Sequence, residues 1–286
     1  MISEVPGAGV ARPGINERMR QLRHIALDMD GTIYHGDEVF PFTNAFLASL
    51  RELGVGYSFL TNNSSRSSDD YVKHLRRIGI PAEREQIYTS TQASISYLRE
   101  SMPAVKRLFL LGTDSMAGEM TEAGFALTED SATDEPDAVL VGFDLGLSYR
   151  RLCRAAYWIK QGKPFLASHP DRICPTNEPT VLVDCGAFCA ALQSATGRAP
   201  DAILGKPDPR MLHGLMHRHG LKASELAMVG DRLYTDVEMA RRSGALGVLV
   251  LTGEATAEEA ARQNPPPDLV LEDLSALGKA LQEAKR

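Results

Sequence analysis

Short runs of apolar residues alternate with segments of helical period along almost the whole chain. The runs at residues 24–27, 55–60, 86–89, 226–229 and 246–251 have the length expected of buried strands. Apolar residues recur every three or four positions in the intervening segments, at residues 44–53, 68–78, 93–99 and 235–243. This alternation of strands and helices predicts an α/β fold whose parallel sheet is covered by helices on both faces.

The middle of the chain repeats the same alternation independently. Further strands are expected at residues 108–111, 138–141 and 165–167, each followed by a helical segment. We therefore predict a second, smaller α/β domain inserted into the first. The expected division is a flexible leader at residues 1–22, a core at residues 23–103 and 201–286, and an inserted domain at residues 104–200.

Charge and composition narrow the classes of partner and the compartment. The 37 acidic residues outnumber the 31 basic ones, for a formal net charge of −6, so nucleic acid is not an expected partner. No apolar run approaches the ~18 residues that cross a bilayer, and the first residues lack the apolar segment of a secretory signal. The four cysteines form no C-x-x-C pair. We expect a cytoplasmic protein without a membrane partner.

Two aspartates directly follow the first apolar run. In parallel α/β sheets, ligands bind beyond the carboxyl ends of the strands, so residues at these positions are candidates for chemistry. Asp28 and Asp30 lie two apart, and on an extended backbone their side chains point the same way. Two close carboxylates are unfavourable unless a cation or a shared proton compensates them. A simple Asp-Gly turn with a solvated aspartate remains the alternative.

Three other segments carry polar residues at comparable places. Thr61 and Asn62 follow the second run, where hydroxyl, amide and backbone N–H groups can bind anionic oxygens. Lys206 directly precedes a predicted helix, an unfavourable position for a cation that a bound anion would relieve. Asp231 follows the strand at residues 226–229, and Asp236 lies five residues further along.

Together, these residues resemble the four motifs of the haloacid dehalogenase superfamily. Those motifs are D-x-D-G-T, a strand-end Thr or Ser, a Lys, and G-D followed by a second Asp, and they occur here in that order. The segments LDMDGTIYHGD, FLTNNSS, VLVGFD, ATGRAPDAILGKPDP and MVGDRLYTDV are similar to the NagD-like (p-nitrophenylphosphatase-like) phosphatases of subclass IIA. The resemblance spans nearly all of residues 24–275 and implies a Rossmann-like parallel-sheet core with an inserted α/β cap domain.

The resemblance also implies catalytic and metal-binding roles. Asp28 is expected to be the nucleophile that forms an aspartyl-phosphate, and Asp30 the general acid and base. Mg²⁺ is the expected cofactor, held by the Asp28 and Asp231 carboxylates and the backbone carbonyl of Asp30. Asp236 is expected to orient a metal-bound water from the second shell.

Further residues are expected to bind the substrate. Thr61 would donate a hydrogen bond to a phosphoryl oxygen, and Lys206 would neutralise charge on the nucleophile and the transferring group. The remaining candidates are two phosphate contacts in the core motifs and two leaving-group contacts in loops of the inserted domain: Asn62, the Gly31 amide, His169 and Asp184.

These roles together predict an Mg²⁺-dependent phosphomonoesterase acting on a small soluble phosphometabolite. A phosphomutase on the same fold and a phosphosugar-binding regulator without turnover remain alternatives. A dehalogenase needs no metal and no acid at the second position, and Asp30 and Asp231 argue against it. Caps of this subclass often pair, so the resemblance also leads us to expect a homodimer formed through the cap. The motifs do not name the substrate.

Overall fold

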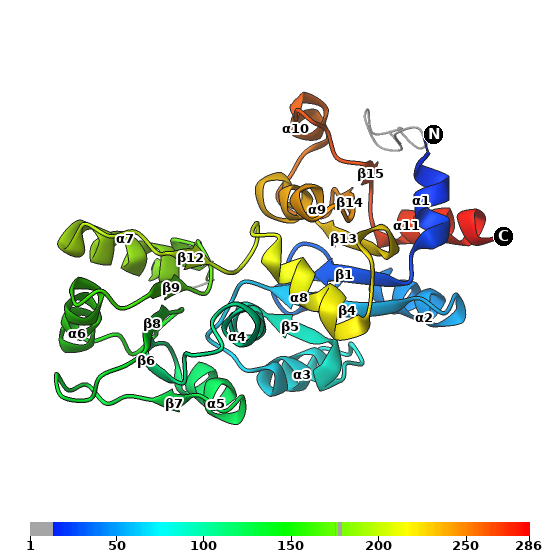
Figure 1. Ribbon diagram of the computed structural model, residues 1–286. Coiled ribbons are helices and arrows are strands. Elements are labelled where there is room, and N and C mark those ends of the chain that lie inside the picture. The colour runs from blue at the N-terminus through cyan, green and yellow to red at the C-terminus, as the bar shows by residue number, and fades with distance from the viewer. Residues whose placement is uncertain (1–13, 175, 177–178) are drawn as a thin grey trace. The chain divides into compact units, whose positions relative to one another are not determined.

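The computed structural model describes residues 14–174, 176 and 179–286, and these form two compact units. The core unit comprises Val72–Ile87, Leu212–Arg286 and the described part of Met1–Leu60. The inserted unit comprises Thr61–Tyr71 and the described part of Tyr88–Met211. Each unit contains its own sheet with helices packed against it, as Figure 1 shows. The predicted mixed α/β fold with a parallel-sheet core is confirmed.

The core sheet has six strands in the order β15-β14-β13-β1-β4-β5. Its strands are β1 (His24–Asp28), β4 (Gly56–Thr61), β5 (Ile87–Thr89), β13 (Leu226–Gly230), β14 (Leu246–Val250) and β15 (Leu269–Leu271). The pairs of β1 with β13 and β4, and of β14 with β13 and β15, are parallel. In this register Leu27 pairs with Val229, so β1 and β13 end at the same edge of the sheet. The residues that follow these two strands therefore meet there.

Helices cover the core sheet, and a short hairpin follows its first strand. Helix α11 (Leu274–Lys285) packs against both α1 (Ile15–Gln21) and α2 (Thr43–Glu52), and Figure 1 shows α1 beside α11. Helix α9 (Glu238–Ser243) packs against β13 and β14. The remaining elements of this part of the chain are β2 (Tyr34–His35), β3 (Glu38–Val39), α3 (Ser68–Arg77), α8 (Arg210–His219) and α10 (Ala257–Arg262), with short 3₁₀ turns at Arg84–Gln86 and Ala223–Glu225.

Helix α1 lies within the segment that the sequence predicts to be a flexible leader. Ile15, Met19 and Leu22 are buried, and their spacing puts them on one face of the helix. Arg20 Nε donates a hydrogen bond to the carbonyl of Ala284 in α11 at 2.8 Å. The prediction of a leader is therefore wrong for residues 15–21, where a one-sided apolar face is buried by packing on α11. Residues 1–13 of the predicted leader lie outside the described residues.

The inserted unit has a five-stranded sheet in the order β12-β9-β8-β6-β7, and all its strand pairs are parallel. Its strands are β6 (Arg107–Leu111), β7 (Ala126–Leu127), β8 (Ala138–Val141), β9 (Phe165–Ala167) and β12 (Ala202–Ile203). Its helices are α4 (Ser90–Ser101), α5 (Asp114–Glu122), α6 (Tyr149–Lys160) and α7 (Cys185–Thr196). A separate antiparallel pair joins β10 (Ile173–Cys174) to β11 (Leu182–Val183).

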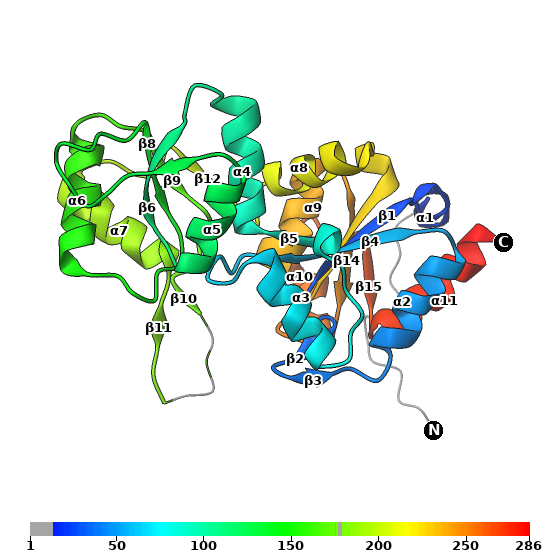
Figure 2. The ribbon, with the colours of Figure 1, turned by 90° about the horizontal axis from the view of Figure 1, so that it is seen from below.

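Alternate residues of the inserted sheet face opposite layers of helices. Phe109 and Val139 pack in a cluster with residues of α6 and α7. Leu108 and Leu140 pack in a second cluster with residues of α4 and α5. Because successive side chains of a strand point to opposite faces, continuous apolar runs such as these fill both clusters. Figures 1 and 2 show α6 and α7 side by side against this sheet.

The inserted unit extends beyond the predicted limits of residues 104 and 200. Strand β12 pairs with β9, so residues 202–203 complete the inserted sheet. Helix α4 packs its apolar side, including Ile95 and Leu98, into the same unit. Sequence periodicity shows where strands and helices are, but it does not show which sheet a two-residue strand joins. No helix among the described residues is long and apolar enough to cross a membrane.

Candidate active site

Three aspartates of the core unit come together at the carboxyl edge of its sheet. Asp28 is the last residue of β1, Asp231 follows β13, and Asp236 lies on a π-helical turn, Leu233–Val237. One carboxylate oxygen from each lies within 4.8 Å of the other two. Asp231 and Asp236 are buried, at 2% and 1% exposure, and Asp28 is half-buried. Three residues that the motifs single out are thus gathered into one acidic cluster.

Glycines allow the backbone to close around this cluster. A Cβ at Gly31 would lie 2.5 Å from Asp231 Oδ2, and one at Gly253 would lie 2.0 Å from it. A Cβ at Gly230 would lie 2.3 Å from Asp236 Cγ. Gly31 also has φ +82°, which side chains other than glycine rarely adopt. Any larger residue at these three positions would displace a carboxylate.

The electrostatics of the cluster favour a bound cation. Burial raises the pKa of Asp231 to about 7, and the negative charges of Asp28 and Asp236 add to the effect. Asp231 Oδ1 is buried without a hydrogen-bond partner in the structure. Oxygen ligands of this kind are those that Mg²⁺ prefers, and a divalent cation would compensate the repulsion among the carboxylates. The residues present therefore fit a magnesium ion.

The loop that follows β14 holds the acidic cluster from one side. The backbone N–H of Glu254 donates to Asp231 Oδ2 at 2.7 Å, and Thr252 Oγ1 donates to the carbonyl of Gly31 at 2.6 Å. The Glu254 carboxylate pairs with Arg232 at 2.9 Å. None of the three residues Thr252, Glu254 and Arg232 is among the site residues predicted from the motifs above. The one signal for Thr252 and Glu254 is their position just beyond a strand end, and for Arg232 it is adjacency to Asp231.

Asp30 and Gly31 lie in the turn between β1 and β2. The Asp30 carboxylate is 61% exposed and lies 3.4 Å from His35 Nδ1, so it is open to solvent, unlike the buried Asp231 and Asp236. The Gly31 N–H donates to the carbonyl of Tyr34 at 2.8 Å. The prediction that this amide contacts phosphate is therefore contradicted, because the turn already uses its only backbone donor.

The other predicted phosphate contacts belong to the inserted unit. Thr61 is the last residue of β4, and its Oγ1 accepts a hydrogen bond from Asn63 N at 3.2 Å. Lys206 is buried, and its backbone N–H donates to Asn62 Oδ1 at 2.7 Å. Asn62 Nδ2 donates to the carbonyl of Lys206 and to Asp171 Oδ2, both at 3.1 Å. The side-chain amide of Asn62 is thus fully engaged within the unit, so a phosphate contact of Asn62, which stays a prediction, would have to use its backbone N–H.

His169 and Asp184 are fully buried, at 0% and 3% exposure. His169 Nε2 lies 2.9 Å from Asp184 Oδ1, and His169 Nδ1 lies 2.8 Å from Ser168 Oγ. Burial lowers the pKa of His169, but the negative charge of the Cys185 thiolate and the hydrogen bond and charge of the Asp184 carboxylate outweigh this and raise it to about 9. The prediction that these residues bind a leaving group is therefore contradicted, because each is bonded to the other inside the unit.

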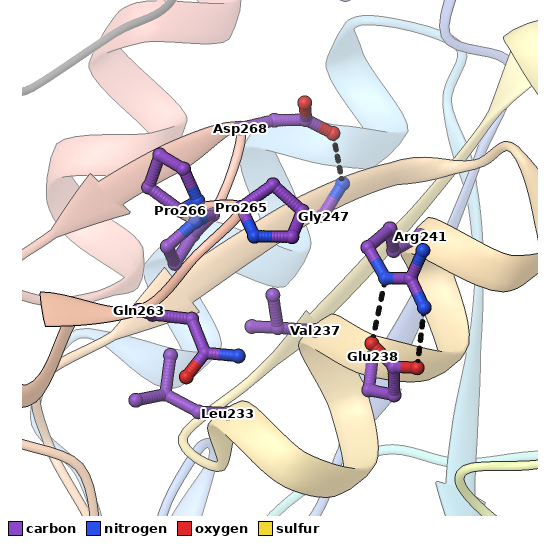
Figure 3. A pocket seen from close by; sticks show the side chains of 10 residues that line it. Leu233, Val237, Glu238, Arg241, Gly247, Gln263, Pro265, Pro266 and Asp268 are labelled. Atoms are coloured by element: carbon purple, nitrogen blue, oxygen red, sulfur yellow. Dashed lines mark hydrogen bonds and ion pairs between the residues drawn. The ribbon is translucent and has the colours of Figure 1, made fainter.

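A small cavity of the core unit lies apart from this chemistry. Figure 3 shows it between Leu233, Val237, Gln263 and the Pro265–Pro267 segment. Its volume is about 30 Å³, enough for a water molecule or two. The charged groups around it are already bonded, Arg241 to Glu238 in two places and Asp268 to the N–H of Gly247. None of the three clustered aspartates lines it, so it is not a candidate for the active site.

Comparison with known proteins agrees with this arrangement. A family model described as haloacid dehalogenase-like hydrolase matches residues 25–126, and a related haloacid dehalogenase-like model matches residues 203–277. The acid sugar phosphatase of Staphylococcus aureus is 31% identical over 257 residues, which are 90% of this chain and 97% of that protein.

Two solved structures share the fold over nearly the whole chain. The 4-nitrophenylphosphatase of Thermotoga maritima matches with a TM-score of 0.86 and 37% identity, covering 93% of this chain and 99% of its own. The glycerol phosphate phosphatase of Mycobacterium tuberculosis, in complex with magnesium, matches with a TM-score of 0.84 and 31% identity, covering 93% and 79%. The chain therefore belongs to the haloacid dehalogenase-like hydrolases. Within that family, the motifs quoted above assign it to the NagD-like subclass IIA.

Proposed function

We propose that this phosphoric monoester hydrolase removes phosphate from a small sugar phosphate or related phosphometabolite, with Mg²⁺ as cofactor. The single observation that carries the proposal is the cluster of Asp28, Asp231 and Asp236, whose carboxylate oxygens lie within 4.8 Å of one another. The sugar phosphatase and the glycerol phosphate phosphatase among its relatives support a small phosphorylated substrate. The magnesium bound by the latter supports the choice of metal.

In the first step, a carboxylate oxygen of Asp28 attacks phosphorus and the bond from phosphorus to the ester oxygen breaks. The product is an aspartyl-phosphate on Asp28. The departing ester oxygen takes a proton from Asp30, whose exposed carboxyl can meet a leaving group that arrives from solvent. Bound Mg²⁺, held by Asp28 and Asp231, would supply positive charge that stabilises the phosphoryl oxygens.

In the second step, water attacks the phosphorus of the aspartyl-phosphate and gives its proton to Asp30. The bond from phosphorus to the Asp28 oxygen breaks, so inorganic phosphate leaves and both aspartates return to their starting state. Asp236 helps to hold the site in shape, since its Oδ2 accepts a hydrogen bond from the N–H of Arg232 at 3.2 Å.

Thr61 and Lys206 complete the proposed machinery. Thr61 would donate its hydroxyl proton to a phosphoryl oxygen, and the Lys206 ammonium would balance the charge of the transferring group. Phosphoryl transfer depends chiefly on positioning and charge stabilisation. Replacement of Lys206 by Ala should therefore lower kcat/KM on every phosphate ester by a similar factor, whatever the leaving group.

Release of inorganic phosphate from a panel of sugar, glycerol and aryl phosphates, with and without Mg²⁺, tests the proposal. We expect turnover that a chelator stops and that added Mg²⁺ restores. The Asp28→Asn variant is the matched control, because it keeps the size of the side chain and removes the nucleophile. A phosphomutase would instead move phosphate between positions of the substrate. Binding of a sugar phosphate without release of phosphate from any substrate would favour a regulator and overturn the proposal.

A further inference from the structure

The side chain of Asn62 clamps the backbone of Lys206 on both sides. Asn62 Oδ1 accepts from Lys206 N at 2.7 Å, and Asn62 Nδ2 donates to Lys206 O at 3.1 Å. Both residues belong to the inserted unit, although 144 positions separate them in the sequence. A side-chain amide that satisfies both polar groups of one backbone residue fixes its position and its rotation together.

Asp171 determines which way the Asn62 amide points. Asp171 Oδ2 accepts the second proton of Asn62 Nδ2 at 3.1 Å. In the flipped orientation, the amide oxygen would face two acceptors, this carboxylate and the Lys206 carbonyl. The flipped amide would also turn its N–H₂ group toward the N–H of Lys206. Asp171 therefore selects the orientation in which the clamp closes.

The loop that carries Asp171 is in turn attached to the start of α7. The N–H of Gly186 donates to the carbonyl of Asp171 at 2.7 Å, and a Cβ at Gly186 would lie 2.1 Å from the carbonyl oxygen of Pro170. Two residues before Asp171, His169 is bonded to Asp184, the N-terminal cap of α7. The buried pair that the sequence assigned to substrate binding thus anchors this loop.

The atoms around Gly205, the residue before Lys206, are packed too closely for the clamp to shift on that side. A Cβ at Gly205 would lie 2.6 Å from Asn62 Oδ1, 2.7 Å from His169 Cβ and 2.9 Å from the carbonyl of Ser168. The residue before Lys206 therefore touches both the clamp and the loop after β9. A movement of that loop changes the surroundings of Lys206 directly as well as through Asn62.

We propose that Asn62 is the positioning residue of Lys206, and that Asp171 couples it to the loop that follows β9. The geometry of the clamp stands by itself, whereas its importance for catalysis rests on the role proposed for Lys206. A displaced lysine would weaken binding of the phosphate dianion and slow its transfer, since misplacement by about 1 Å can cost 10²-fold in rate.

Four variants test the coupling through activity. Asn62→Ala removes both links to Lys206, and kcat/KM should fall by about 10- to 100-fold. N62D sets a carboxylate against Asp171 and the Lys206 carbonyl, and it should lose at least as much. D171N should lose less than about threefold, since an asparagine oxygen can still accept from Asn62. The double variant N62D/D171N restores a donor–acceptor pair and should recover about tenfold or more over N62D.

Asn44→Ala is the matched control. Asn44 also donates its amide to a backbone carbonyl, that of Gly79 at 3.1 Å, but it belongs to the core unit. Inhibition by inorganic phosphate should weaken in Asn62→Ala and stay unchanged in Asn44→Ala. The melting temperatures of all variants show whether a substitution causes a general loss of structure. Such a loss would lower the melting temperature of N62D/D171N as much as that of N62D.

A second measurement does not depend on turnover. The chain has eight lysines, so ¹⁵N-lysine labelling gives a simple amide spectrum, and the signal of Lys206 is identified by its absence from the K206R variant. Asn62→Ala should shift this signal and speed its hydrogen exchange, whereas N62D, which keeps an acceptor, should retain protection. An unchanged Lys206 signal in Asn62→Ala, or a double variant no more active than N62D, would overturn the proposal. If the wild-type protein hydrolyses no phosphate ester, the proposed function fails while the amide measurement still decides the clamp.

Discussion

Acid should destabilise the core unit through one buried histidine at the start of β1. His24 is 6% exposed, its Nε2 lies 2.9 Å from Ser58 Oγ, and its ring stacks on that of His219 at 4.3 Å between centroids. Burial, together with the nearby charge of His219, lowers the pKa of His24 from 6.5 to about 3. The folded protein therefore keeps this imidazole neutral at a pH where the unfolded chain takes up a proton.

The direction and size of the effect follow from this difference in pKa. A lowered pKa in the folded state means that stability is complete above about pH 6.5 and is lost as the pH falls toward about 3. Each pKa unit corresponds to about 1.4 kcal/mol, so the limit is about 4 to 5 kcal/mol. Between about pH 7 and about pH 4.5, the free energy of unfolding should fall by about 2.5 kcal/mol through His24 alone.

The assay compares urea unfolding of wild type and His24→Gln at these two pH values. Glutamine keeps a group that can bond Ser58 but does not titrate. Loss of the stacking on His219 lowers the stability of the variant at both pH values, so the comparison uses the change between the two pH values and not the absolute stabilities. His213→Gln is the control, since His213 lies on the same helix as His219 but is exposed. We expect the loss on acidification to shrink by about 2.5 kcal/mol in His24→Gln and to be unchanged in His213→Gln.

An equal loss of stability in wild type and His24→Gln would refute this reasoning. It would mean that His24 is protonated within the folded protein, or that the unfolded chain already shields it. Carboxylates contribute to acid unfolding in both proteins, so the comparison isolates the histidine from them.

Three further predictions concern the acidic cluster and the turn that follows β1. Asp28→Asn should abolish turnover, while the melting temperature stays the same or rises because the change removes one of three crowded negative charges. Near wild-type activity of this variant would exclude Asp28 as the nucleophile. Asp30→Asn should lower kcat by about 10²- to 10⁴-fold on alkyl phosphates and by less on aryl phosphates, and rapid quenching should trap phospho-enzyme. Equal losses on both kinds of substrate, without trapped phosphate, would contradict an acid–base role. Saturating Mg²⁺ should raise the melting temperature of wild type and not that of Asp231→Asn, measured by scanning fluorimetry; equal shifts would locate the metal elsewhere.

The sheets and the acidic cluster could be predicted because each depends on local pattern. Continuous apolar runs identify buried strands, and parallel strands bring their carboxyl ends to one edge. Asp28 directly follows such a run and Asp231 follows another one residue later, and their meeting needs only the pairing of β1 with β13. Two-residue strands such as β7 and β12 are too short to show a period, so the edges of the inserted sheet could not be drawn from sequence.

The polar contacts could not be predicted, because their partners are remote in sequence. Nothing in the sequence near Asn62 indicates that its side chain will bond the backbone of Lys206. Nothing near Asp184 indicates that its carboxylate will pair with His169. Loop polar residues were therefore assigned to substrate when the fold uses them to satisfy one another. Helix α1 was missed for a related reason. Its apolar residues are few and lie among arginines, so they can be recognised as a buried face only when the packing of α11 against them is known.

Strand β1 has one proton-sensitive end and one reactive end. His24 begins it and Asp28 ends it, and four steps of about 3.3 Å put the two roughly 13 Å apart. Substitutions separated by more than about 7–10 Å usually contribute independently. Acid tolerance can therefore be engineered at the amino end of this strand, through His24, without the trade-off against activity that stabilising changes beside a reactive centre often bring. In a directed-evolution library, that end of the sheet is where changes can accumulate before selection on turnover begins.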